Sequence, residues 1–254
     1  MYHQFKALAE IDITVEAMEV GPTTHYAMGG VRVDGDTQMS TVPGLFACGE
    51  CGAGINGANR LGGNSLSDLL VLGKLAGEHA ARFAGDNSAG EIDAGQVADA
   101  RKWALAPFER FDESAAGVEG PYQIQYQLQE TMQDLVGIVR TGAEMERALG
   151  EIEILRKRSQ AVGVVGNREF NPGWHTALDL HNLMTVSEAI TRSALERKES
   201  RGAQFREDFP EKDPDRWGSM NNVVRKATDG TMEIEQVPIP EMPDELKEII
   251  EEMG

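Results

Sequence analysis

The sequence predicts a chain in two parts, an α/β part followed by an all-α part, with an irregular acidic tail. Within residues 21–85, short strand-like runs at 30–33 and 44–48 alternate with glycine-rich loops. Within residues 91–210, long segments carry apolar residues at three- and four-residue spacing, as amphipathic helices do. After Pro210 the chain is rich in Pro, Asp and Glu, and little core is expected there.

Each element follows from local signals. Residues 2–9 have helical spacing, and 11–20 alternate weakly, as a strand would, until Gly21-Pro22 ends the run. Residues 66–83 predict a helix with small residues that suit close packing on a sheet. Four further helices of an antiparallel bundle are expected at 94–112, 122–139, 141–162 and 174–200. A final helix is expected at 244–253.

The composition excludes several classes of protein. With a net charge of -18, wholesale binding to nucleic acid or anionic lipid is not expected. The longest apolar runs are too short to cross a bilayer, and the residues after Met1 do not resemble a signal peptide. An acidic protein that binds an anionic ligand must supply positive charge locally, which directs attention to Arg60 and His25.

The loop at 57–66, Gly-Ala-Asn-Arg-Leu-Gly-Gly-Asn-Ser-Leu, is the most informative segment. Its glycines let a flat ligand approach the main chain, and Asn64 or Ser65 is expected to cap the following helix. Free N–H groups and the positive end of a helix dipole would then face a delocalised anion. Arg60 offers a planar fork of donors that suits a carboxylate.

Two other motifs permit more than one interpretation. Cys48 and Cys51 form a Cys-x-x-Cys pair, but no second pair completes a metal site, so reduced thiols in a cytoplasmic protein and no metal are expected. Residues 52–57 match G-x-G-x-x-G, yet no helix follows directly and no acidic ribose ligand follows about 20 residues on. A loop that approaches a ligand is favoured over a first-strand phosphate loop.

Together, the motifs at 23–30, 42–50 and 57–66, and a fourth at 197–210, resemble the flavoprotein subunit of succinate dehydrogenase and fumarate reductase, in the FAD-dependent oxidoreductase 2 superfamily. The resemblance is to the C-terminal part of that subunit. It implies an α/β plus all-α fold, in which a Rossmann-like FAD-binding domain ends and a helical bundle follows. The implied parts are the end of a capping domain at 1–20, the C-terminal part of the FAD-binding domain at 21–85, the bundle at 91–210, and an acidic, Pro-rich tail at 211–254.

The resemblance also implies roles for single residues. His25 and Arg60 would bind the substrate's carboxylates, and Glu50 would accept hydrogen bonds from the ribose of FAD. Further contacts to the flavin would come from Asn64, Ser65 and Leu66. The sequence departs from the family at Asn56, where many members have histidine, and has one residue fewer between Glu50 and Arg60.

The implied activity is the interconversion of succinate and fumarate by hydride transfer to FAD, with electrons passing to an iron–sulfur subunit and membrane anchor subunits. That places the chain in the cytoplasm, peripheral on the inner face of the membrane. The family's glycine-rich pyrophosphate loop and its proton-transferring arginine are not found in this sequence. No catalytic residue is therefore expected in this chain, which would be inactive alone and would need an N-terminal half, such as a companion chain.

The sequence also predicts a polar network between the two domains and permits two rival functions. A polar network joining the helical and flavin domains is expected from Arg201, Arg206, Glu207 and Asp208. One rival function is that of a sister flavoenzyme, such as L-aspartate oxidase or adenylylsulfate reductase. Another is a non-catalytic helical interaction protein with a vestigial flavin edge, which retention of flavin by the purified protein would exclude.

Overall fold

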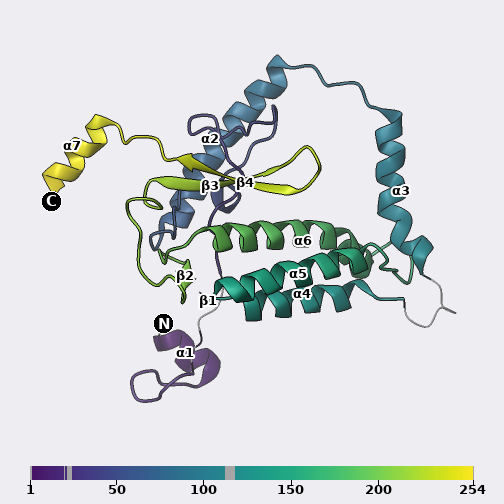
Figure 1. Ribbon diagram of the computed structural model, residues 1–254, viewed down its shortest axis with the longest axis horizontal. Coiled ribbons are helices and arrows are strands. Elements are labelled where there is room, and N and C mark those ends of the chain that lie inside the picture. Colours follow the sequence, from purple (N-terminus) through teal and green to yellow (C-terminus); the bar gives the residue numbers. More distant parts are fainter. Residues whose placement is uncertain (1, 20, 22–24, 112–117, 254) are drawn as a thin grey trace.

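The computed structural model describes residues 2–19, 21, 25–111 and 118–253 (Figure 1). Thr23 and Thr24, which belong to the first motif, lie outside the described residues. The elements in chain order are α1 (Tyr2–Ala9), the short 3₁₀ helix η1 (Gly49–Cys51), α2 (Asn64–Asp86), α3 (Ala94–Arg110), α4 (Pro121–Leu135), β1 (Val139–Arg140), α5 (Gly142–Ser159), α6 (Pro172–Glu196), β2 (Phe205–Arg206), β3 (Met220–Lys226), β4 (Met232–Pro238) and α7 (Asp244–Met253).

Helices α4, α5 and α6 pack side by side and enclose the main core (Figure 1). Their apolar stripes meet in one cluster of side chains that are at most 4% exposed: Ile124, Leu128, Ile152, Leu155, Val162, Leu180 and Met184. A second cluster lies toward the C-terminal end of α4: Leu135, Val136, Met145, Ala148 and Ala194. The bundle predicted from helical periodicity is confirmed for these three helices.

Polar side chains fix where these helices begin. Thr141 caps α5 by accepting from the N–H of Glu144, and Asn171 caps α6 by accepting from the N–H of Trp174 at 3.0 Å. Helix α4 begins with Pro121, whose fixed φ and missing N–H suit a first helical position. Residue 139, expected to end α4, instead begins strand β1, which pairs in parallel with β2.

Helix α3 stands apart from the bundle and touches it only through its C-terminal half (Figure 1). The indole Nε1–H of Trp174 on α6 donates to the carbonyl of Ala104 at 2.6 Å, and Phe108 packs on the same ring at 5.3 Å. The expectation of a fourth bundle helix was therefore wrong in its packing, although the helix itself was predicted. Its apolar residues are too few: Val97 and Trp103 remain more than half exposed.

The segment before α2 is held by isolated bridges rather than by strands. Val31 pairs with Gly52, Val33 with Ser40, and Met39 with Phe46, so the strands predicted at 30–33 and 44–48 are reduced to single bridges. Residues 11–19, which alternate weakly, form a turn and irregular structure, so the strand suggested by that alternation was wrong there, and Val20 lies outside the described residues.

The segment after Pro210 contains more structure than its composition predicted. Strands β3 and β4 form an antiparallel hairpin in which Met220 pairs with Pro238 and Lys226 with Met232. The hairpin lies against the C-terminal end of α6, where the side-chain amide of Asn222 donates to the carbonyl of Ser193 at 3.1 Å. Trp217 is 1% exposed. The prediction of an irregular tail was thus wrong here, because one buried tryptophan and a few alternating residues suffice to dock a hairpin on an existing surface.

Candidate functional site

Three of the sequence motifs meet in the irregular segment that precedes α2. Glu50, on η1, accepts a hydrogen bond from the backbone N–H of Ala27 at 2.7 Å. The bridge between Val31 and Gly52 joins the same two segments. Gly30 has φ +151°, and a Cβ there would lie 2.3 Å from the carbonyl oxygen of Cys51, so only glycine permits this close approach.

The N-terminus of α2 forms one wall of the site. Its N-cap is Gly63, in the left-handed region at φ +87°, and no side chain caps this end of the helix. The prediction that Asn64 or Ser65 caps α2 was therefore wrong: Asn64 is the first helical residue, and its N–H donates to the carbonyl of Leu61. Because a helix leaves its first N–H groups without intrahelical partners, this end can accept an anion or a carbonyl oxygen.

Arg60 lies half-buried beside that helix terminus. Its Nη1 donates to the hydroxyl of Ser65 at 3.3 Å, and its guanidinium carbon stands 4.6 Å from the ring centroid of Tyr26. Arg60 makes no other hydrogen bond within the part of the chain that the structure describes, so its Nε and Nη2 donors remain for a ligand. This pair of donors is one edge of the fork that binds a carboxylate with two parallel hydrogen bonds.

Tyr26 and Arg60 connect to a buried carboxylate on α2. The side-chain amide of Asn56 donates to the hydroxyl of Tyr26 at 3.4 Å and to Oδ2 of Asp68 at 3.4 Å. Asp68 is 7% exposed, and its Oδ1 has no hydrogen-bond partner among the described residues. The sequence alone gave no role to Tyr26 or Asp68. A polar residue within the apolar run at 66–72 was the signal that could have identified Asp68.

The remaining predicted site residues lie on the open side of this arrangement. His25 is exposed and precedes Tyr26, which brings it to the segment that contacts Arg60. Leu66 is 68% exposed, on the first turn of α2. A Cβ added at Gly54, Gly57 or Gly62 would meet nothing within 4 Å. The site is thus a surface with open space along its glycines.

These features fit one edge of a flavin. The uncapped helix terminus offers N–H donors, and the open glycines and exposed Leu66 offer a flat surface against which a ring system could lie. The carboxylate of Glu50 keeps Oε2 free of hydrogen bonds within the described ranges, so it could accept from a ribose hydroxyl. The predicted cofactor residues thus lie on two elements, η1 and α2, that contact each other, and their contact with a flavin stays a prediction.

The segment at 197–208 joins the bundle to this part of the chain. The N–H of Ala203 donates to the carbonyl of Ala58, in the glycine loop, at 3.0 Å. Glu199, fully buried, bridges Arg197 and Arg201. Although burial opposes ionisation, hydrogen bonds from Arg201, from a backbone N–H and from Arg197 lower the pKa of Glu199. Of the residues predicted for this network, Arg201 pairs with Glu199 and Arg206 pairs with Asp208. The side chain of Glu207 makes no hydrogen bond or ion pair among the described residues, and the contact with the glycine loop is made by backbone groups.

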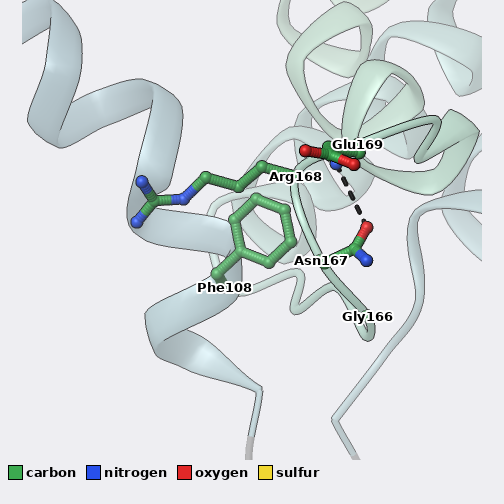
Figure 2. Close-up of a pocket in the computed structure, with 5 residues that line it drawn as sticks. All are labelled: Phe108, Gly166, Asn167, Arg168 and Glu169. Carbon is green, nitrogen blue, oxygen red and sulfur yellow. Dashed lines mark hydrogen bonds between the residues drawn. The ribbon is translucent and has the colours of Figure 1, made fainter.

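Other features of the chain give weaker evidence for a functional site. Cys48 and Cys51 are free thiols, and the described residues include no group of three or more metal-ligating side chains. A shallow cavity of about 540 Å³ lies between α3 and the loop before α6 (Figure 2). Phe108 and residues 166–169 line it, and the N–H of Glu169 donates to Oδ1 of Asn167 within the loop. None of the predicted site residues lines it.

No described helix has the length and apolar character needed to span a bilayer.

Comparisons with known proteins match two parts of the chain to family models. Residues 1–66 match the model of an FAD binding domain, and residues 125–249 match the model of the fumarate reductase flavoprotein C-terminal region. FAD is the cofactor that the first of these models assigns to this part of the chain.

Known proteins align with this chain over most of its length. It is 37% identical, over 233 residues, to the fumarate reductase flavoprotein subunit of Mycobacterium tuberculosis; the match covers 90% of this chain and 40% of that protein. The structure of Mycobacterium smegmatis Sdh1 in complex with UQ1 superimposes with a TM-score of 0.87 at 45% identity, covering 98% of this chain and 42% of that one. Quinol fumarate reductase of E. coli superimposes with a TM-score of 0.80 at 31% identity, covering 95% and 42%.

The chain thus spans about two fifths of the length of the relatives it matches. The two family models lie in the order and over the segments that the motifs indicated, one on the glycine loops and one on the helical bundle and hairpin. The chain belongs to the family of succinate dehydrogenase and fumarate reductase flavoprotein subunits.

Proposed function

We propose that this chain forms the substrate-binding, C-terminal side of an FAD-dependent enzyme that interconverts succinate and fumarate. The observation that carries the proposal is the placement of Arg60. Its guanidinium lies at the uncapped N-terminus of α2, with one edge of the fork free, in a chain whose net charge is -18. In so acidic a protein, a single oriented cation beside a helix terminus is well suited to select a small dianion.

Arg60 and His25 would each bind one carboxylate of the substrate. Arg60 would use Nε and Nη2 for a bidentate contact, and the exposed His25 would donate to the second carboxylate. Two contacts at the two ends of a four-carbon diacid fix its long axis. Hydride transfer depends steeply on such orientation, so these residues contribute to the rate by positioning.

FAD would rest on the wall formed by η1 and the start of α2. Glu50 would accept from its ribose, and Asn64, Ser65 and Leu66 would contact the flavin at the helix terminus. FAD supplies a ring that accepts or gives up a hydride. The positive end of the α2 dipole would stabilise negative charge on that ring, which favours the reduced form.

The remaining parts of the enzyme would come from elsewhere. The relatives are more than twice as long as this chain, and we infer that an N-terminal half supplies the pyrophosphate loop and the proton-transferring group. An iron–sulfur subunit and membrane anchor subunits would carry the electrons onward, with this chain peripheral on the inner face of the membrane.

The test is to co-express the chain with an N-terminal half from a relative and to compare Arg60→Lys with Arg82→Lys. Lysine keeps the charge but lacks the fork. Succinate oxidation should fall by about two to three decades in Arg60→Lys while bound flavin is retained, since losing one oriented contact in the transition state costs about 2 to 4 kcal/mol. Arg82 is exposed on α2 and makes no ion pair within the described chain, so Arg82→Lys should match the wild type. A colourless assembly, or normal turnover in Arg60→Lys, would contradict the proposal.

A further inference from the structure

We propose that Tyr26, Asn56 and Asp68 form a positioning chain that fixes the plane of the Arg60 guanidinium and thereby sets the geometry of the carboxylate it binds. The inference rests on the proposed function and adds to it three residues that lie beside the substrate-binding group.

The first link is the stacking of Arg60 on Tyr26. The guanidinium carbon stands 4.6 Å from the ring centroid, close enough for an attractive cation–π contact. An arginine side chain has several rotatable bonds, and the single hydrogen bond from Nη1 to Ser65 leaves rotation about that contact open. A ring beneath the guanidinium restricts this rotation, so Nε and Nη2 point in one direction.

The second link fixes the ring itself. The side-chain amide of Asn56 has two N–H donors, and both acceptors within reach are accounted for: the hydroxyl of Tyr26 and Oδ2 of Asp68, each at 3.4 Å. Asn56 therefore ties the end of the tyrosine ring to the body of α2. The amide acts as a spacer between a half-buried ring and a buried carboxylate.

The third link explains the buried charge. Asp68 on α2 is 7% exposed, and burying a carboxylate is costly unless it is hydrogen-bonded. Its one contact within the described chain is Asn56, and Oδ1 has no partner. A group buried at such cost, aimed at the residue that orients Tyr26, anchors the chain rather than serving the core.

The experiment uses the FAD-loaded assembly of the chain with its N-terminal half, and two readouts. Succinate binding is measured by calorimetry, with propionate as a monocarboxylate probe. The Nε–Hε resonance of Arg60 is followed by NMR in the same assembly before succinate is added, because a ring beneath the guanidinium shifts that resonance. The variants are Tyr26→Leu, Tyr26→Phe and Asn56→Ala, with Tyr126→Leu, an exposed tyrosine on α4, as the matched control.

Tyr26→Leu should weaken succinate binding about 5- to 30-fold, the range that a desolvated cation–π contact provides, with bound FAD unchanged. Tyr26→Phe keeps the ring and should lose less, and Asn56→Ala should resemble Tyr26→Phe, since both remove the same hydrogen bond. Propionate binding should change less than succinate binding, because one carboxylate can follow a mobile arginine. The Arg60 resonance should lose its ring shift in Tyr26→Leu alone.

Two failures can be told apart. A wild-type assembly that holds FAD but does not bind succinate overturns the proposed function and this inference with it. Wild-type binding with equally tight binding in Tyr26→Leu, or an Arg60 resonance unmoved by that change, overturns the inference alone. If Tyr26→Leu does not fold, the comparison of Asn56→Ala with Tyr126→Leu decides: equal succinate affinities in these two overturn the positioning chain.

Discussion

Replacing Asp208 by asparagine tests how the chain after α6 is attached to the bundle. The carboxylate accepts two hydrogen bonds from Arg206, through Nε and Nη2 at 2.8 Å each, and one from the N–H of Gly142 at the start of α5. Arg206 is 1% exposed and also donates to the last carbonyls of α6, including that of Ala194 at 2.9 Å. Asp208 thus neutralises a buried arginine that joins one helix start to one helix end.

The pH dependence follows from the pKa of this carboxyl group. The hydrogen bonds from Arg206, with that from Gly142, lower the pKa of Asp208 from 3.8 to about 2 despite partial desolvation. A group whose pKa is lower in the folded state stabilises the fold above its unfolded pKa and loses that contribution as the pH falls through its folded pKa. The shift corresponds to roughly 2 kcal/mol, and about 1 to 2 kcal/mol remains after allowance for solvent screening of a side chain that is 34% exposed.

Urea unfolding followed by tryptophan fluorescence, with Trp217 as a buried reporter, measures the effect. Asp208→Asn should lower the unfolding free energy by about 1 to 2 kcal/mol between pH 5 and 7, and the difference should shrink to roughly half near pH 3. Asp99→Asn, on the exposed side of α3, controls for removing one negative charge from an acidic chain. A difference that is equal in both variants, or constant from pH 7 to 3, would refute the reasoning.

Three further predictions concern the junction and the assembly. Gly202 has φ +60° and its Cβ would lie 2.5 Å from the carbonyl oxygen of Ala58, so Gly202→Ala should destabilise the chain by about 1 to 3 kcal/mol in thermal unfolding, whereas Gly150→Ala, in open space on α5, should stabilise it slightly. The chain alone, mixed with FAD, a dye acceptor and succinate, should show no turnover above background; robust turnover would mean that it needs no partner. Co-expression with an N-terminal half should raise solubility and flavin content, and identical solubility with and without that half would count against the proposed division.

The helical part could be predicted from sequence because its signals are local and repeat. Apolar spacing along α4, α5 and α6 gave their positions to within a few residues, and cap residues such as Thr141 and Asn171 mark their starts. The hairpin of β3 and β4 could not be predicted, because its residues are mostly polar and its order depends on docking against α6. Tertiary contact, not strand propensity, decides such elements.

The candidate site could be predicted as a set of motifs but not as a geometry. The sequence indicated Arg60 and the helix that follows it, and it assigned the cap of α2 to Asn64 or Ser65. In the structure Gly63 takes that position through a positive φ, which no side-chain pattern reveals. Tyr26 contacts Asn56 and Arg60 across 30 or more positions of the chain, and Asn56 contacts Asp68 across 12 positions, so only the fold brings these residues into view.

The two parts of the chain differ in how completely they are buried, and this difference bears on where the rest of the site comes from. In the bundle, core side chains are at most 8% exposed. On the first two turns of α2, by contrast, Leu66, Leu69, Leu70 and Val71 are 49–76% exposed, and Asp68 and Ala76 are the only buried residues of this helix. Covering the part of these four side chains that is still exposed would contribute about 4 to 8 kcal/mol, a large fraction of the whole stability of a domain. We expect the N-terminal half of the proposed enzyme to cover these side chains with apolar surface. That half would then lie at the helix terminus beside Arg60 and would also close the site over flavin and substrate.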